Sequence, residues 1–233
     1  MRHLKSFLFA VAAGFCIGLG GMLNLVCRSY GLEVLGGIIF SVGLLLICLF
    51  SFNLFTGKVG YLFEQKNKLS YLLDLLIYYV GNFVGAVGFG TTMRFVSSVS
   101  NEDSALYKAA TSLGEHKLCQ LGNGAHGEPW YALFVLSIFC GVLVFFAVEL
   151  FKRETSSPLV KVVGIFVCVG GFVVSGFEHC IADMFYLSIS GCLFNNVAGS
   201  LLSILLGSSG NILGAFVAWY LLNYLGKKEY KSK

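Results

Sequence analysis

Long stretches without any charge limit the fold of this chain more than any other feature. No Asp, Glu, Lys or Arg occurs between Met184 and Gly226. Of the 233 residues, 57% are hydrophobic and 12% are charged, whereas about 25% are charged in an average soluble domain. A membrane-spanning helix needs about 20 mostly apolar residues. We therefore expect an all-α, multi-pass protein of the cell (inner) membrane with six transmembrane helices.

The expected spans fill the chain as a single transmembrane domain over residues 1–233. They begin near Leu4, Val34, Leu69, Pro129 and Pro158, and the sixth follows a turn at 191–196. Both prolines stand at helix starts, where the missing backbone N–H costs nothing. A polar outer loop covers about 98–128 and a basic tail covers 227–233. We expect the outer loop to be solvated, and a lid over a vestibule is the alternative.

The distribution of Lys and Arg places both termini in the cytoplasm, because cytoplasmic loops carry the excess of basic residues. With six spans, twelve basic residues fall on the side of the termini and four on the opposite side. The four are Arg28, Arg94, Lys108 and Lys117. The twelve are Arg2, Lys5, Lys58, Lys66, Lys68, Lys152, Arg153, Lys161, Lys227, Lys228, Lys231 and Lys233. The positions of the basic residues therefore predict the topology, and the net charge of +4 does not indicate a nucleic-acid partner.

A short internal repeat suggests two inverted halves, at about 1–100 and 129–226. The motif Gly-Asn-x-x-Gly occurs at 81–85 in the third span and again at 210–214 in the sixth. Each copy follows a span with a polar interruption, at 53–57 and 178–183 respectively. Inverted repeats with interrupted helices in matching positions place a transport site near the middle of the membrane.

Three ionisable residues lie within six positions of the fifth span, namely Glu178, His179 and Asp183. Each costs about 2.5–3.5 kcal/mol on membrane-insertion scales, so we expect them to face a cavity and not lipid. A polar cluster that only joins helices is the alternative. Two half-helices that meet there would point their positive N-terminal ends at an anion. Thr56 is expected to offer a hydroxyl beside this point, or simply to cap its helix.

Apolar side chains near this point are candidates for a gate. Phe40 and Leu44 share one face of the second span, and Phe172 lies seven residues before His179. On periodicity alone, these three are ordinary core residues.

The cysteines do not suggest a metal site or a cofactor. All eight are scattered singly, without a Cys-x-x-Cys or Cys/His ligand spacing. An intramembrane enzyme that uses Cys180 with His179 is one alternative function. Adjacent residues on a helix point about 100° apart, so the two side chains would not face each other. We therefore expect no catalytic activity.

The chain resembles the formate/nitrite transporter family over most of its length, from Leu4 to about Leu225. The most specific match is FEHCIADMF at 177–185 together with NLFTG at 53–57. The segment GGIIFSVGL at 36–44 and the two Gly-Asn-x-x-Gly motifs add to it. The resemblance implies an aquaporin-like protomer with interrupted helices two and five, assembled as a homopentamer. It also implies transport of small monovalent anions or their acids.

The resemblance also implies a role for individual residues. His179 matches the family's central histidine, Thr56 the threonine that faces it, and Glu178 the acid beside it. Phe40, Leu44 and Phe172 match the cytoplasmic constriction, and Leu54 matches the extracellular one.

Three departures from the family's pattern concern the substrate. The vestibule lysine that most members carry just before the fourth span is missing here. Either His126 or an inward-folded Lys117 could replace it. Glu128 acts against this, because its negative charge repels an anion. Cys140 and Gly141 stand where many members have an asparagine, so Gly141 is a further candidate vestibule position. Asp183 replaces a usual asparagine.

The expected function is a proton-assisted channel for formate, nitrite, hydrosulfide or a related weak acid. Protons would be its co-substrate and the lipid bilayer its surroundings. A passive channel for small neutral solutes is the alternative.

Overall fold

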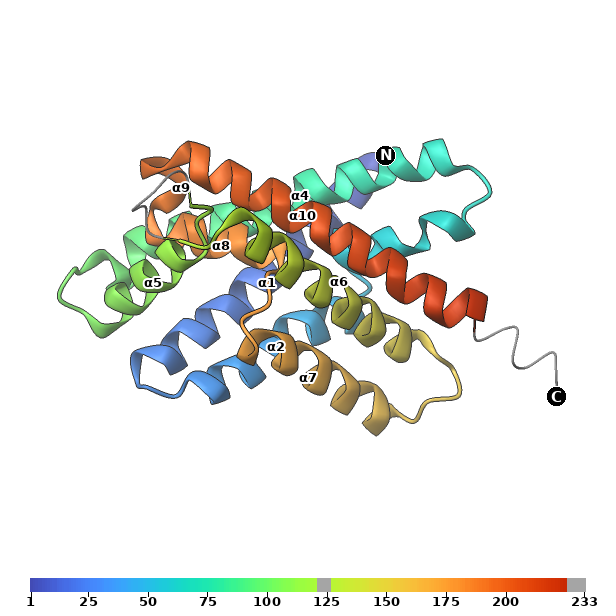
Figure 1. The fold of residues 1–233 in the computed structure, drawn as a ribbon, viewed down its shortest axis with the longest axis horizontal. Coiled ribbons are helices and arrows are strands. Elements are labelled where there is room, and N and C mark those ends of the chain that lie inside the picture. The colour runs from blue at the N-terminus through green and yellow to red at the C-terminus, as the bar shows by residue number, and fades with distance from the viewer. Residues whose placement is uncertain (121–126, 226–233) are drawn as a thin grey trace.

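The computed structural model describes residues 1–120 and 127–225, and these residues are almost entirely helical (Figure 1). The first half contains α1 (Arg2–Ser29), α2 (Glu33–Leu49), α3 (Phe55–Lys58), η1 (Val59–Glu64), α4 (Lys68–Val96), η2 (Ser98–Ser100) and α5 (Ala105–His116). The second half contains α6 (Trp130–Lys152), α7 (Pro158–Val174), α8 (Cys180–Ser190), α9 (Cys192–Asn195), α10 (Val197–Tyr220) and η3 (Leu221–Leu225).

Four of the described helices are long and apolar enough to cross a bilayer, namely α1, α4, α6 and α10 with its extension to Asn223. Three shorter apolar helices, α2, α7 and α8, complete the membrane region. This arrangement confirms the predicted all-α membrane class with interrupted helices. The number of six spans stays a prediction, because α2 with α3 and α7 with α8 each have to be counted as one span.

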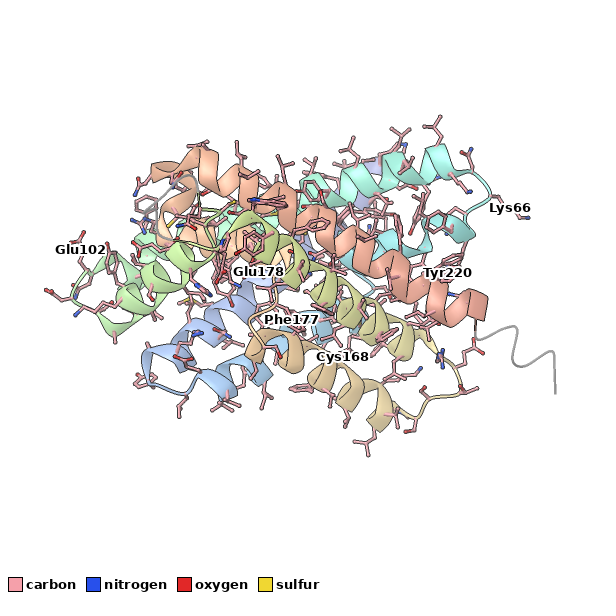
Figure 2. All side chains as sticks on the ribbon, in the orientation of Figure 1. Lys66, Glu102, Cys168, Phe177, Glu178 and Tyr220 are labelled. Atoms are coloured by element: carbon pink, nitrogen blue, oxygen red, sulfur yellow. The ribbon has the colours of Figure 1, made fainter. Side chains whose placement is uncertain are left out.

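The start of α1 and the end of α10 lie at the same end of the molecule, toward the right of Figure 1. Arg2 joins α1 to Asp74 of α4 at 2.8 Å, and Trp219 of α10 donates to Glu64 of η1 at 2.8 Å. We call this the termini end and the opposite one the far end. Figure 2 shows Lys66 and Tyr220 at the termini end and Glu102 at the far end, with Glu178 between them.

The two Gly-Asn-x-x-Gly motifs pack their helices in the same way. A Cβ on Gly85 of α4 would lie 2.0 Å from the carbonyl oxygen of Val11 in α1. A Cβ on Gly214 of α10 would lie 2.0 Å from the carbonyl oxygen of Ile138 in α6. Only glycine allows backbones to approach this closely. The α1–α4 and α6–α10 pairs are therefore equivalent, as an inverted repeat requires.

The outer loop is not simply solvated, and in this respect the sequence-based expectation is wrong. It contains α5, which Ser104 caps by accepting a hydrogen bond from the backbone N–H of Tyr107 at 3.0 Å. Leu106, Ala110 and Gly114 follow at intervals of four residues and are buried. This narrow stripe packs against α8, so α5 roofs part of the far end.

Candidate functional site

Asn82 holds the first interrupted helix in place. Its side-chain oxygen accepts from the backbone N–H of Phe55, the first residue of α3, at 2.8 Å. Its amide nitrogen donates to the carbonyl oxygens of Ala10 in α1 and Asn53 before α3, both at 2.8 Å. A fully buried asparagine thus satisfies backbone groups that the break in the helix leaves exposed.

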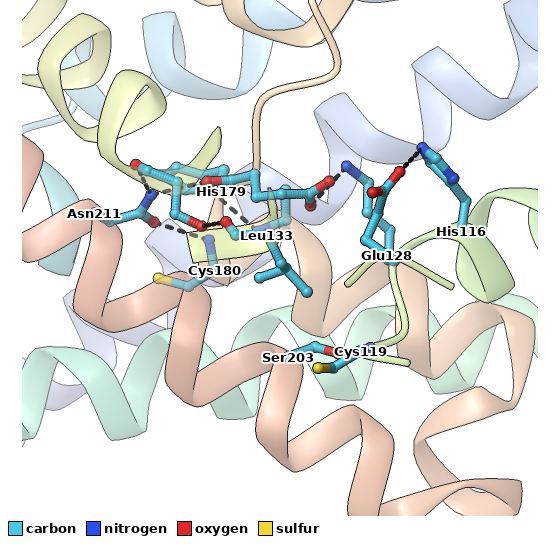
Figure 3. Close-up of polar contacts among 12 residues, drawn as sticks. His116, Cys119, Glu128, Leu133, His179, Cys180, Ser203 and Asn211 are labelled. Atoms are coloured by element: carbon cyan, nitrogen blue, oxygen red, sulfur yellow. Dashed lines mark hydrogen bonds and ion pairs between the residues drawn. The ribbon is translucent and has the colours of Figure 1, made fainter. Parts of the chain in front are cut away.

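Asn211 does the same for the second interrupted helix (Figure 3). It accepts from the N–H of Cys180, the first residue of α8, at 2.9 Å. It donates to the carbonyl oxygens of Ser137 in α6 and Glu178 before α8, both at 2.8 Å. The two halves therefore position α3 and α8 with the same device. The sequence revealed the repeated asparagine but not its three bonds.

His179 and Thr56 meet where the two half-helices begin. The Nε2 atom of His179 lies 2.8 Å from the Thr56 hydroxyl, and both residues are almost fully buried. His179 is also the N-cap of α8, because its Nδ1 accepts from the N–H of Ala182 at 3.2 Å. The neutral ring therefore carries its proton on Nε2 and donates it to Thr56. The capping alternative for Thr56 is wrong, since Leu54 occupies the N-cap of α3.

Lys117 folds inward from the end of α5, which is one of the two replacements considered for the missing vestibule lysine. Its Nζ lies 2.8 Å from the Glu178 carboxylate, and the two side chains are 8% and 1% exposed. Burial by itself lowers the pKa of Lys117. The charges of Glu178 and Asp183 outweigh that effect and raise the pKa above its ordinary value, so the ammonium stays charged.

Asp183 lies in the first turn of α8 and is 2% exposed. Neither of its carboxylate oxygens has a hydrogen-bond partner among the described residues, and the same holds for Oε1 of Glu178. Buried polar groups are nearly always hydrogen-bonded. The two carboxylate oxygens of Asp183 therefore face a space that a donor can enter.

That space is a cavity of about 170 Å³ at the far end. Lys117, His179 and Asp183 line it from within, and Arg28 and His116 line its outer part. At the rim, the His116 ring lies 3.4 Å from Glu128, as Figure 3 shows.

A second cavity of about 310 Å³ opens at the termini end. Its lining includes Leu54, Cys48 and two lysines, and no carboxylate. Lys58 donates to the side chain of Asn53 at 2.6 Å, and the Lys152 ammonium lies 3.6 Å from the ring centre of Tyr61. Neither lysine was predicted from the sequence as a site residue, although Lys58 directly follows the first interruption.

An apolar barrier separates the two cavities. It encloses only about 10 Å³ of free space, lined by Phe40, Leu44, Leu54 and Phe172, among others, with His179 at its side. Phe40 meets Phe172 edge-on at 5.9 Å, and Phe172 stacks on the His179 ring at 5.8 Å. The barrier contains the residues predicted as constrictions, and their role as a gate stays a prediction.

The predicted sides of the constrictions do not fit together with the predicted cytoplasmic termini. Phe40 and Phe172 line the far cavity, whereas Leu54 lines the cavity at the termini end. The reason is the direction of α2, which runs from the far end toward the termini end. Phe40 lies in the first half of α2, whereas Leu54 lies beyond the last residue of α2, just before α3 begins.

Two further positions were predicted for the vestibule. Gly141 lies at the crossing of α6 and α10, where a Cβ would sit 2.3 Å from the carbonyl oxygen of Asn211, and it is not among the described residues that line the far cavity. His126 and the tail at 227–233 lie outside the described residues.

A multi-pass helical protein with two interrupted helices meeting at a barrier between two cavities has the architecture of a membrane channel or transporter. The chain belongs to the formate/nitrite transporter family, whose model matches residues 1–225. This finding confirms the resemblance noted from the sequence.

Among curated relatives, the chain is 26% identical over 200 residues to the formate channel FocA of Haemophilus influenzae, covering 80% of this chain and 66% of that one. It is 28% identical to a probable formate transporter of Methanothermobacter thermautotrophicus, covering 93% and 88% of the two chains. The chain thus spans a little under two thirds of the length of the Haemophilus channel.

Two solved structures share the fold. One is described as a pentameric formate channel with formate bound, and matches with a TM-score of 0.76 and 27% identity, covering 96% of this chain and 98% of that one. The other is an ion channel of the same family, with a TM-score of 0.77 and 22% identity, covering 99% and 90% of the two chains.

Proposed function

We propose that this protein is a channel for small monovalent anions or their weak acids, with formate as the first candidate. The observation that carries the proposal is the His179–Thr56 contact beside an apolar barrier between two cavities that each contain a lysine. A bare anion does not cross an apolar barrier cheaply, so protonation of the substrate would assist its passage. Relatives named as formate channels support this substrate class.

His179 would act as a neutral donor. Its Nδ1 is occupied by the cap of α8, so charging the ring would break that hydrogen bond. The Nε2–H fixes the Thr56 oxygen as an acceptor, which leaves the Thr56 hydroxyl proton free to point at a substrate oxygen in the passage.

The same contacts argue against an intramembrane enzyme. A nucleophilic cysteine needs a base within hydrogen-bond reach. Both ring nitrogens of His179 are engaged by Thr56 and by the N–H of Ala182, and Cys180 starts the helix beside them. The cysteine therefore serves as a buried packing residue.

We also propose a homopentamer with both termini in the cytoplasm. The related solved structure is pentameric, and large apolar side chains are exposed along α1, α4, α6 and α10. Such faces require lipid or neighbouring protomers. Among the described basic residues, Arg2, Lys58, Lys66 and Lys152 lie at the termini end, as Figure 2 shows for Lys66, which supports the cytoplasmic orientation.

Uptake into proteoliposomes tests the function. Formate, nitrite, acetate, lactate, hydrosulfide and a neutral solute would be compared at about pH 5.5 and about pH 7.5, on either side of the ordinary pKa of histidine. We expect anion uptake that rises with acidity, and His179→Phe should change both the pH dependence and the charge selectivity. His3→Phe, at the exposed start of α1, is the matched control.

Equal passage of all solutes, unaffected by pH or by His179→Phe, would contradict the proposal and indicate a passive neutral pore. Ionic current under an anion gradient would instead show that the anion crosses without its proton.

A further inference from the structure

Two buried carboxyl groups, one of them lining the far cavity, act on the single buried lysine of that cavity. Glu178 and Asp183 are 1% and 2% exposed, and both belong to the interrupted fifth span. Lys117 donates to one oxygen of Glu178, and the other three carboxylate oxygens have no hydrogen-bond partner within residues 1–120 and 127–225. Two carboxylates beside one ammonium would leave a net negative charge in a buried site, which is costly.

In the part of the chain that the structure describes, the surrounding elements do not supply a second buried cation. Cys140 of α6 is fully buried next to this cluster, and Tyr186 and Cys180 lie on α8 itself. His179 is held by its two hydrogen bonds. The remaining charged or titratable groups of the cavity lie in its outer part, where Arg28 is within 3.4 Å of Glu33 and His116 faces Glu128.

We propose that Glu178 and Asp183 share one proton, and that Asp183 thereby admits a monovalent anion to the barrier only together with a proton. Two neighbouring carboxyl groups that cannot both ionise commonly share one proton. With that proton bound, Lys117 and the pair of acids are together neutral. This inference rests on the proposed function, because it names the proton source for the same passage.

The transfer step balances without any other reactant. The carboxyl O–H bond of the pair breaks, and its proton binds an oxygen or sulfur lone pair of the anion to form the neutral acid. The pair is left as two carboxylates, and water at the far end returns one proton to it. The neutral acid then crosses between Phe40 and Phe172 and dissociates beyond the barrier.

Asp183 differs in one respect from the asparagine that the family resemblance implies at this position. An amide cannot bind this proton, so an asparagine would leave the Lys117–Glu178 pair neutral at every physiological pH. Asp183 instead makes the charge of the cavity depend on pH. At high pH the cavity becomes negative and excludes anions, whereas at low pH it becomes neutral and admits them.

The experiment compares the wild-type protein with Asp183→Asn, which keeps the side-chain shape, and with Asp103→Asn. Asp103 is exposed at the far end outside the cavity and provides the matched control. Infrared spectra of the full chain in lipid would be recorded across a pH titration. We expect the C=O stretch of a protonated carboxyl group near neutral pH in wild type and Asp103→Asn, and its loss in Asp183→Asn.

Formate uptake provides the second readout. The ratio of uptake at about pH 5.5 to that at about pH 7.5 should fall about tenfold in Asp183→Asn. The variant lacks both the shared proton that assists uptake at the lower pH and the negative charge that excludes the anion at the higher pH. A wild-type protein without the carboxyl band, or a variant with an unchanged ratio, would overturn the inference.

The two proposals fail in different ways. If Asp183→Asn behaves like wild type while His179→Phe still alters uptake, the shared proton is refuted and the channel function stands. If the carboxyl band depends on Asp183 but no tested anion is transported, the shared proton stands and the proposed function is refuted.

Discussion

Lys117 and Glu178 join two parts of the chain that have no local connection. The lysine follows α5 and the glutamate precedes α8, 61 residues later. The ammonium stays charged because the acids raise its pKa despite burial. Either partner alone would therefore be a buried and uncompensated charge, which costs far more than the intact pair contributes.

Lys117→Met should consequently destabilise the protein by about 3–5 kcal/mol, the usual cost of breaking a buried ion pair. Adding Glu178→Gln should recover much of this loss, because the orphaned charge is then removed. Thermal unfolding in detergent would measure both effects, with Lys108→Met on the exposed side of α5 as control. Equal stability of Lys117→Met and the control would contradict the burial of this pair.

The chemistry of the site was predictable from the sequence where the residues belong to one motif. Glu178, His179 and Asp183 are conspicuous because charge is expensive in an apolar span. The partners that complete the site come from distant segments, as with Lys117, Asn82 and Asn211. No periodic pattern relates residues that are brought together only when the interrupted helices fold back.

At the level of whole elements, the close crossing of α4 over α1 depends on glycine. Gly85→Ala would place a methyl group 2.0 Å from a backbone oxygen, whereas Gly88 in the same helix has no neighbour within 4 Å. We expect Gly85→Ala to destabilise the protein by about 1–3 kcal/mol through overpacking. Gly88→Ala should be neutral or slightly stabilising. Unfolding temperatures of the two variants in the same detergent test this, and matching values would refute the packing argument.

The apolar elements were predicted well because a span must be long and uncharged to cross a bilayer. The helix α5 was missed for the opposite reason. Its buried stripe of Leu106, Ala110 and Gly114 is narrow and lies in polar sequence, so its stability comes from contact with α8. The sequence did contain a signal for this helix, namely small or apolar residues at four-residue spacing after Ser104, a residue type that commonly caps a helix.

For the whole molecule, the barrier and the orientation can be tested with one native thiol. Cys48 lines the cavity at the termini end and is half-buried, while Cys180 is fully buried. If the termini are cytoplasmic, a membrane-impermeant thiol reagent should block anion flux when applied to inside-out vesicles. The same reagent applied from the opposite side should have no effect, because the apolar barrier keeps it from Cys48.

Cys48→Ser should abolish this block, whereas Cys168→Ser, which removes a half-buried thiol of α7 outside both cavities, should leave it unchanged. A block from the opposite side alone, still dependent on Cys48, would mean that the termini end faces outward. A block from both sides would mean that Phe40, Leu44, Leu54 and Phe172 do not close the passage to a molecule of that size. The passage would then discriminate by charge alone, and protonation would not be needed to cross it.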